Sequence, residues 1–225
     1  MTAAPLTRVR LERSGPCEHD GVSNPGVRRL PDDLRGSHVY RTVRRSLGRA
    51  FADDPVWTWL IRGRNSADRA AAVLGELAHL HAELGGEVTA TDGHEAHAVW
   101  VGPDARPATT GDYLRRAHRV IRPLGLRGAA RLGALTEVDA RHPHEPHWYL
   151  ALLGTDPDHQ RRGHGDALVR PVTDRADETG VGCYLESSKE SNVPYYRRFG
   201  FEVVDVLHLD KGRGPDLFLM WRDPR

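Results

Sequence analysis

Two glycines, Gly163 and Gly165, stand between an apolar run at 147–154 and an amphipathic stretch at 164–179. A glycine lets the backbone approach a ligand closely, and the N–H groups at the start of a helix attract phosphate. The spacing therefore predicts a strand, then a polar turn that binds a phosphate group, then a helix that begins at the turn.

The charges around this turn partly support that prediction. Arg161 and Arg162 add positive charge, whereas the carboxylate of Asp166 would repel a phosphate unless it is turned outward into solvent. Position 168 is Leu, so the third glycine of the dinucleotide-binding fingerprint is missing. No Lys followed by Ser or Thr comes after the glycines, which excludes a nucleotide-binding P-loop.

A second group of residues that could do chemistry lies downstream. Glu186 falls in a strand-like run at 182–187, and Tyr195 and Tyr196 fall in a short helix expected at 192–198. A carboxylate can act as a general base and a tyrosine hydroxyl as a general acid. We expect Tyr195 to face the core, although the two tyrosines could exchange places.

These two segments resemble the signatures of the GNAT superfamily of N-acetyltransferases. The spacing Gln160-x-x-Gly163-x-Gly165 is similar to the first signature, and the segment 192–201 is similar to the second. Within the superfamily, the chain is most similar to the puromycin N-acetyltransferases, and the resemblance covers roughly residues 28–225. It also rests on Ala50-Phe51-Ala52-Asp53 with Pro55, Glu145-Pro146 before Trp148, Pro157-Asp158-His159-Gln160 and Leu185-Glu186.

The resemblance implies an α/β (α+β) fold with a mixed central sheet of six to seven strands flanked by helices. Two neighbouring strands would splay apart to form the site for acetyl-CoA, the co-substrate. The implied activity is transfer of its acetyl group to an amine of a small molecule, through a tetrahedral intermediate. The acceptor would be an antibiotic or a biosynthetic intermediate, with a role in self-resistance or antibiotic tailoring. The residues implied to bind acetyl-CoA are Leu153, Gly154, Thr155, Gln160, Arg161, Arg162, Gly163, His164, Gly165 and Asn192.

The resemblance also places the catalytic groups. Tyr196 stands where family members carry the acid that protonates the leaving thiolate. The base that takes a proton from the amine is expected to be Glu186 or Glu145. Glu137 and a water held by His147 are the remaining alternatives.

Composition limits the other classes of function. The 225 residues carry 32 basic and 31 acidic side chains, a formal charge of +1, which argues against a dedicated nucleic-acid binder. No apolar stretch is long enough for a membrane span, and no signal sequence is recognisable. The two cysteines, Cys17 and Cys183, have no paired spacing, so we expect a cytoplasmic protein without a disulfide.

The expected elements form one domain at 28–225 after a disordered tail at 1–27, with a short edge strand near Val27. Ser37 and Ser66 are the expected caps of the first two long helices. The expected helices are 37–52, 66–84, 111–121, 127–138, 164–179 and 192–198, and the expected strands are 87–91, 96–101, 147–154, 182–187, 201–209 and 216–222.

Several alternatives remain open. An Arg-rich segment at 106–131 could receive an acyl or aminoacyl donor carried on tRNA or on a carrier protein. A third alternative is a non-catalytic module that binds CoA or a metabolite. The prolines between His142, His144, Glu145 and His147 predict an extended loop, so no metal site is expected. Members of the superfamily commonly form homodimers, which makes a second copy of the chain one expected partner.

Overall fold

The computed structural model describes residues 25–106 and 108–225, so most of the tail expected at 1–27, with Cys17, lies outside the described residues. The strands are β1 Val27–Arg29, β2 Glu87–Thr91, β3 Ala96–Val101, β4 His147–Thr155, β5 Gly182–Ser187, β6 Glu202–His208 and β7 Asp216–Arg222. The α-helices are α1 Tyr40–Ala50, α2 Pro55–Leu60, α3 Ser66–Glu83, α4 Thr110–Asp139, α5 His164–Thr179, α6 Val193–Arg197 and α7 Leu209–Gly212. Two short 3-10 turns are η1 Pro157–His159 and η2 Glu190–Asn192.

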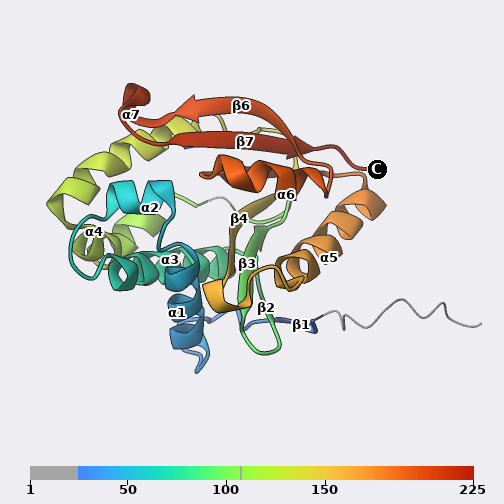
Figure 1. Cartoon of the computed structure of the whole chain (residues 1–225), viewed down its shortest axis with the longest axis horizontal. Helices are drawn as coiled ribbons and strands as arrows, with labels where there is room; N and C mark the ends of the chain where they lie inside the picture. The colour runs from blue at the N-terminus through green and yellow to red at the C-terminus, as the bar shows by residue number, and fades with distance from the viewer. Residues whose placement is uncertain (1–24, 107) are drawn as a thin grey trace, which may run out of the picture.

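The strands form a seven-stranded mixed sheet in the order β1-β2-β3-β4-β5-β7-β6. Only β4 and β5 pair in parallel among these neighbours. Parallel neighbours need a crossover connection, and α5 supplies it. The sheet is strongly twisted, since β6 and β7 run almost across β2–β4 in Figure 1. The mixed α/β sheet predicted from the sequence is confirmed.

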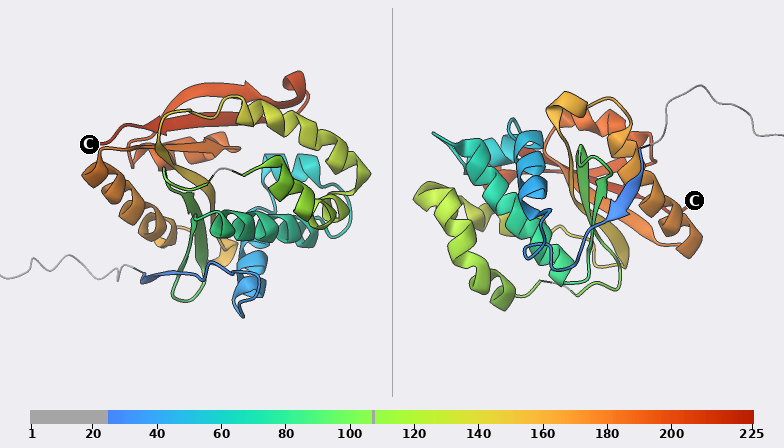
Figure 2. Two further views of the ribbon diagram at one scale, coloured as in Figure 1. Left: turned by 180° about the vertical axis from the view of Figure 1, so that it is seen from behind. Right: turned by 90° about the horizontal axis from the view of Figure 1, so that it is seen from below.

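Helices cover both faces of the sheet. Figures 1 and 2 show α1–α4 gathered on one side and α5 on the other. On the first side, Val88, Val99 and Leu152 pack against α1 and α3. On the second side, Trp100 and Leu185 join the apolar faces of α5 and α6. Successive strand residues point to opposite faces, so each strand contributes to both cores.

Most expected elements lie where the sequence placed them, and α5, β2, β3, β5 and β7 agree to the residue. The first long helix starts later than expected: it begins at Tyr40, because the Ser37 hydroxyl donates to the Leu34 carbonyl instead of capping the helix. The cap of α3 is Asn65 rather than Ser66. The short helix α2 was not expected, and α4 joins the two predicted helices across a kink at Gly125.

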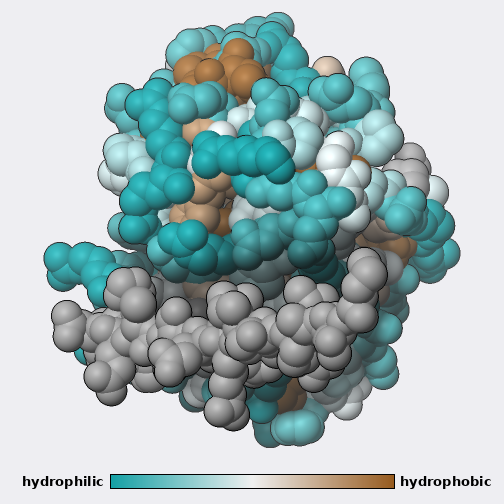
Figure 3. Space-filling model, turned by 90° about the vertical axis from the view of Figure 1, so that its right-hand side faces the viewer, coloured by the Kyte–Doolittle hydropathy of each residue, from teal (hydrophilic) through white to brown (hydrophobic). Residues whose placement is uncertain are grey.

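The surface and the apolar content fit a globular chain. The side of the molecule that carries α5 and the C-terminus is covered mainly by hydrophilic residues (Figure 3). Cys183 is a free, buried thiol. Among the described residues, we find no helix with the length and apolar character needed to cross a membrane.

Candidate functional site

The parallel strands β4 and β5 separate halfway along their length. Their ladder runs from His147 opposite Gly182 to Leu150 opposite Leu185 and then ends. Beyond that point β4 continues to pair with β3, and β5 continues to pair with β7. The arms that diverge are therefore 151–155 on β4 and 186–187 on β5.

A bulge in β4 accounts for the separation. Val99 pairs with Leu152 and Trp100 pairs with Leu150, so Ala151 is an extra residue opposite β3. A bulge bends its strand and increases the local twist, which here turns the β4 arm away from β5. The edge of this arm that faces β5 has backbone groups without a ladder partner, and such groups need a hydrogen-bonding partner.

The predicted acetyl-CoA residues of β4 lie on this arm. Leu153 pairs with Ala98, Gly154 with His97 and Thr155 with Ala96. A Cβ on Gly154 would lie 2.9 Å from the Ala50 side chain, so this glycine allows α1 to pack closely.

The glycine turn leads from β4 to the start of α5, and its two glycines have different roles. Gly163 is the N-cap of α5 with φ of 80°, a left-handed conformation that favours glycine. A Cβ on Gly165 would lie 2.5 Å from the Tyr195 hydroxyl, so this glycine lets Tyr195 approach the first turn of the helix. The turn thus combines a helix N-terminus with a nearby phenol.

The side chains of the turn suit an anion. Arg161 has φ of 62°, and both Arg161 and Arg162 are exposed. The Gln160 amide donates to the Thr155 carbonyl at 3.4 Å, which ties the loop to the end of β4. Within the described part of the chain, His164 Nδ1 and Tyr195 Oη are buried atoms without a hydrogen-bond partner. Backbone N–H groups at the helix N-terminus and two exposed arginines together fit a phosphate-bearing ligand.

The carboxylate of Asp166 is paired with two arginines at the protein surface. It lies 3.2 Å from an Arg198 nitrogen of α6 and 3.8 Å from an Arg170 nitrogen of α5. Arginines on two elements therefore hold Asp166, and repulsion of a phosphate at the turn is reduced. The Asp166 side chain stays 24% exposed in this pairing, so it lies partly towards solvent, as predicted.

The two adjacent tyrosines of α6 point in different directions. Tyr196 is buried in the core beside Phe201, and Tyr195 is half-buried with its hydroxyl at the glycine turn. The ring of Tyr195 packs partly against the second core, as expected, but its hydroxyl lies at the glycine turn, where Gly165 leaves space for it. Burial, with a smaller effect from the Asp54 carboxylate, raises the pKa of Tyr196 far above its ordinary value. Its hydroxyl consequently keeps its proton at neutral pH.

Asp54, directly before Pro55, is a functional candidate that was not predicted from the sequence. Its carboxylate accepts from the backbone of Val56 and Trp57, so it caps α2, and it also accepts from the Ser188 hydroxyl. Ser188 directly follows the β5 arm, and burial raises the pKa of Asp54. The sequence signal that could have identified Asp54 as a helix cap is an acidic residue directly before a proline that can start a helix.

Glu186 is the first β5 residue beyond the last pair with β4, at the point where the strands separate. Its side chain is 9% exposed, and its Oε1 atom lies 3.6 Å from His142 Nδ1. Burial and the Glu186 charge raise the pKa values of Tyr149 and Tyr184, which therefore stay neutral beside it. Glu186 is a buried carboxylate in an aromatic environment.

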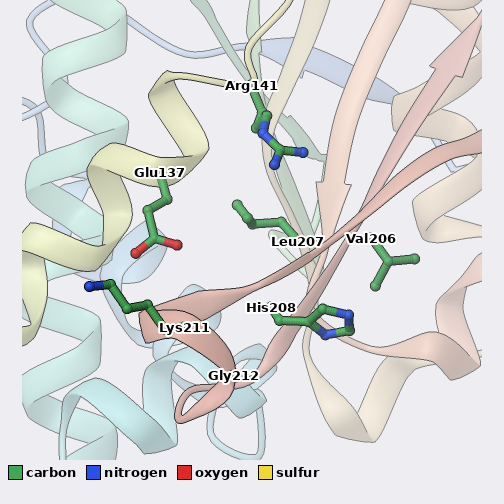
Figure 4. A pocket seen from close by; sticks show the side chains of 7 residues that line it. All are labelled: Glu137, Arg141, Val206, Leu207, His208, Lys211 and Gly212. Carbon is green, nitrogen blue, oxygen red and sulfur yellow. The ribbon is translucent and has the colours of Figure 1, made fainter.

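The other base candidates lie elsewhere. Glu145 is exposed, and its backbone carbonyl accepts a hydrogen bond from His147 Nδ1 at 2.7 Å. Glu137 lines a cavity of about 410 Å³ between the end of α4 and the β6–β7 connection, where it faces Lys211 (Figure 4). Asn192 is exposed at the N-terminus of α6.

A second cavity, of about 330 Å³, lies close to Glu186. Tyr184 and Trp221 contribute rings to it, and Glu145 and Asp205 contribute carboxylates. The Tyr184 ring also contacts His142, and the Trp221 ring contacts His147. Tyr184 thus links the cavity to Glu186, because its ring lines the cavity and contacts His142 beside Glu186.

The Arg-rich segment is largely engaged within the protein. Arg106 and Arg115 pair with Asp112, Arg116 pairs with Glu83, and Arg119 lies 3.8 Å from Glu76. Arg131 donates to the Trp59 carbonyl and stacks over that ring. Arg122 and Arg127 are exposed. These contacts give the segment a structural role on α4.

In the described ranges, no three His, Cys, Asp or Glu side chains are arranged to hold a metal ion.

Comparisons with known proteins agree with this geometry. The model of the acetyltransferase (GNAT) family matches residues 112–201, which span α4, the glycine turn and α6. An uncharacterized N-acetyltransferase of Schizosaccharomyces pombe is 28% identical over 202 residues, covering 82% of this chain and 80% of that protein.

Solved structures share the fold. A protein of Corynebacterium glutamicum, described as histone acetyltransferase HPA2 and related acetyltransferase, has a TM-score of 0.62 at 21% identity, with 90% of this chain and 98% of that one covered. Arylalkylamine N-acetyltransferase 2 from Aedes aegypti has a TM-score of 0.61 at 13% identity, with 90% and 100% covered. A Drosophila melanogaster polyamine N-acetyltransferase has a TM-score of 0.52 at 15% identity, with 88% and 99% covered. The chain is thus similar to the acetyltransferase (GNAT) family over residues 112–201, and it shares the fold of these solved structures.

Proposed function

We propose that this chain, an acyltransferase with the GNAT fold, transfers the acetyl group of acetyl-CoA to an amine of a small molecule. The observation that carries the proposal is the separation of β4 and β5 after Leu150 and Leu185. One end of the opening leads to the glycine turn, and Glu186 stands where the strands part.

The donor would lie along the β4 arm. The backbone of 153–155 would hold the pantetheine, and one N–H group would stabilise the oxyanion that forms on the thioester carbonyl. The turn at 161–165 would bind the pyrophosphate, and Asn192 would contact the donor from the side of β5. Gln160 would hold the loop in position through Thr155.

The reaction needs one base and one acid. The amine nitrogen attacks the thioester carbon, and Glu186 takes a proton from that nitrogen. The carbon–sulfur bond then breaks, and the Tyr196 hydroxyl protonates the leaving thiolate. A neutral, buried Tyr196 suits this role, since it carries its proton until the thiolate forms.

The acceptor would bind next to the cavity lined by Tyr184 and Trp221. Aromatic walls with nearby carboxylates favour an amine that carries an apolar or aromatic group. The fold neighbours named for arylalkylamines and polyamines also act on small amines. The sequence resemblance to puromycin N-acetyltransferases makes an antibiotic, or an intermediate of its synthesis, the first acceptor to test.

The test is titration calorimetry with acetyl-CoA, followed by a thiol-release assay over a panel of amines that includes puromycin. We expect saturable binding of acetyl-CoA and thiol release that depends on one class of amine, with an acetylated product identified by mass spectrometry. Absence of acetyl-CoA binding would contradict the proposal and favour a donor carried on tRNA or on a carrier protein. Binding without thiol release from any amine would contradict the proposed acceptor class.

A further inference from the structure

Glu186 is the first member of a row of three side chains from three segments. His142 Nδ1 lies 3.6 Å from Glu186 Oε1, and His142 Nε2 lies 3.1 Å from His147 Nε2. His147 Nδ1 lies 2.7 Å from the Glu145 carbonyl oxygen. The row thus runs from the carboxylate at the strand separation to a backbone carbonyl in the loop before β4.

The carbonyl at the end of the row determines where the protons lie. A carbonyl oxygen only accepts, so His147 Nδ1 carries a hydrogen and donates to Glu145. Burial lowers the pKa of His147, which keeps this ring neutral and leaves its Nε2 atom as an acceptor. His142 Nε2 must then be the donor between the two rings. A neutral His142 therefore presents an unprotonated Nδ1 to Glu186.

Two proton acceptors consequently face each other, the His142 Nδ1 lone pair and the Glu186 carboxylate. One added proton removes the repulsion between them and creates an ion pair. We infer that Glu186 and His142 accept the amine proton as one unit, with the proton held on His142 Nδ1 and His147 fixing the tautomer. This inference rests on the proposed function, in which Glu186 is the base.

The groups around the pair favour this role. The neighbouring phenols of Tyr149 and Tyr184 stay neutral, so they do not compete for a proton. Burial raises the pKa of Asp139, which faces the pair from α4. The other charged or titratable groups of this region are Arg141, His144 and Glu145 in the loop before β4 and Asp205 on β6.

The proton follows a balanced route. The amine nitrogen forms a bond to the thioester carbon, and its proton passes to Glu186 and then to His142 Nδ1. The His142 side chain is 34% exposed, compared with 9% for Glu186, so it can release this proton to water. Tyr196 loses its proton to the thiolate and regains one from water. The products are the amide and the free thiol, and the protein returns to its starting protonation state.

The pair can be tested in the free protein by proton–nitrogen correlation spectra of its histidines across pH. We expect neutral His142 to carry its hydrogen on Nε2. We also expect the ring signals of His142 to change in Glu186→Gln, because the negative charge next to its Nδ1 atom is lost. The exposed His144 serves as the control, and its ring signals should be the same in both proteins. An Nδ1-protonated neutral His142, or His142 signals that are the same in both proteins, would overturn the inference.

Activity gives the second readout. His142→Gln should lower kcat about ten- to a hundredfold at neutral pH. In this variant, the decline of kcat at low pH should also begin at a lower pH than in wild type, since Glu186 alone then accepts the proton. His144→Gln should leave both the rate and the profile unchanged. A uniform loss of rate in His142→Gln, with the decline at low pH unmoved, would assign His142 a purely structural role.

Failure of the proposed function has a different signature. The histidine spectra need no turnover, so a protein that acetylates no amine can still show the expected His142 tautomer and its dependence on Glu186. That outcome would overturn the assigned reaction and leave the proton-sharing pair in place. A normal acetylation rate with an uncoupled His142 would overturn the inference alone.

Discussion

Tyr195 and Tyr196 show how neighbouring residues of one type acquire separate roles. Tyr196 is buried beside Phe201, whereas the Tyr195 hydroxyl lies at Gly165 on the first turn of α5. The resemblance to the GNAT superfamily predicted Tyr196 as the acid, and burial raises the pKa of its hydroxyl. The direction of Tyr195 depends on a glycine that is distant in sequence, so local pattern could not predict it.

Replacing the proposed acid tests this assignment. Tyr196→Phe should lower kcat about 100- to 10,000-fold, because the thiolate leaves without a proton donor. Acetyl-CoA binding, measured by calorimetry, should remain near the wild-type value. Tyr195→Phe is the matched comparison and should affect the KM for acetyl-CoA more than kcat. Wild-type turnover in Tyr196→Phe would remove this residue from the mechanism.

The two carboxylates proposed as bases can be separated by the same kind of comparison. Glu186 is nearly buried where the strands part, while Glu145 is exposed and contacts His147 only through its backbone carbonyl. Glu186→Gln should reduce kcat about 100-fold or more, and Glu145→Gln less than about tenfold. Steady-state rates at saturating acetyl-CoA provide the measurement. A larger loss in Glu145→Gln would reverse the assignment.

At the scale of elements, the bulge at Ala151 and the helix α5 border the opening that we propose as the donor site. The strand, turn and helix were predicted from the run 147–154 and the two glycines, because their periodicity and spacing are local properties. The bulge was not predictable, since it depends on the register of β4 against β3. Asp54 was missed for a related reason: its partner Ser188 is 134 residues away.

Close packing at the start of α5 leads to a prediction for Gly165. A Cβ there would lie 2.5 Å from the Tyr195 hydroxyl, so Gly165→Ala must displace Tyr195 or the helix start. We expect the KM for acetyl-CoA to rise at least about tenfold, which corresponds to about 1.4 kcal/mol of lost binding. Gly180→Ala at the other end of α5 is the control. It should cost stability through its φ of 67° and leave this KM unchanged.

At the scale of the whole molecule, the sequence predicted the mixed sheet and the order of nearly all elements. Strand-like runs bounded by turn residues predicted β2, β3, β5 and β7. A local hydrogen bond explains why the first helix was predicted to begin too early. The Ser37 hydroxyl donates to the Leu34 carbonyl, so α1 begins at Tyr40. The surroundings of Glu186 combine α4, the loop before β4 and two strands, and such a meeting of distant segments has no local sequence signal.

Global stability should depend on pH through His97. This residue is fully buried between His94 and Ser46, and burial lowers its pKa from 6.5 to about 3. The unfolded chain thus binds the proton more tightly, so stability present above pH 6.5 is lost as the pH falls towards 3. Between neutral pH and pH 5 the loss should be about 2 kcal/mol.

Urea unfolding of wild type and His97→Gln at both pH values measures this contribution. The variant should start less stable at neutral pH and lose about 2 kcal/mol less on acidification. His118→Gln, on an exposed position of α4, should follow the wild type. An unchanged pH dependence in His97→Gln would show that other groups control the acid sensitivity.

The central claim is that acetyl-CoA occupies the opening between β4 and β5. Hydrogen exchange with and without acetyl-CoA, followed by mass spectrometry of peptides, tests it most directly. We predict slower exchange of the amides in 151–155 and 161–166, with little change in the β6–β7 connection at 209–215. Protection confined to the β6–β7 connection, or no protection at saturating acetyl-CoA, would contradict the account.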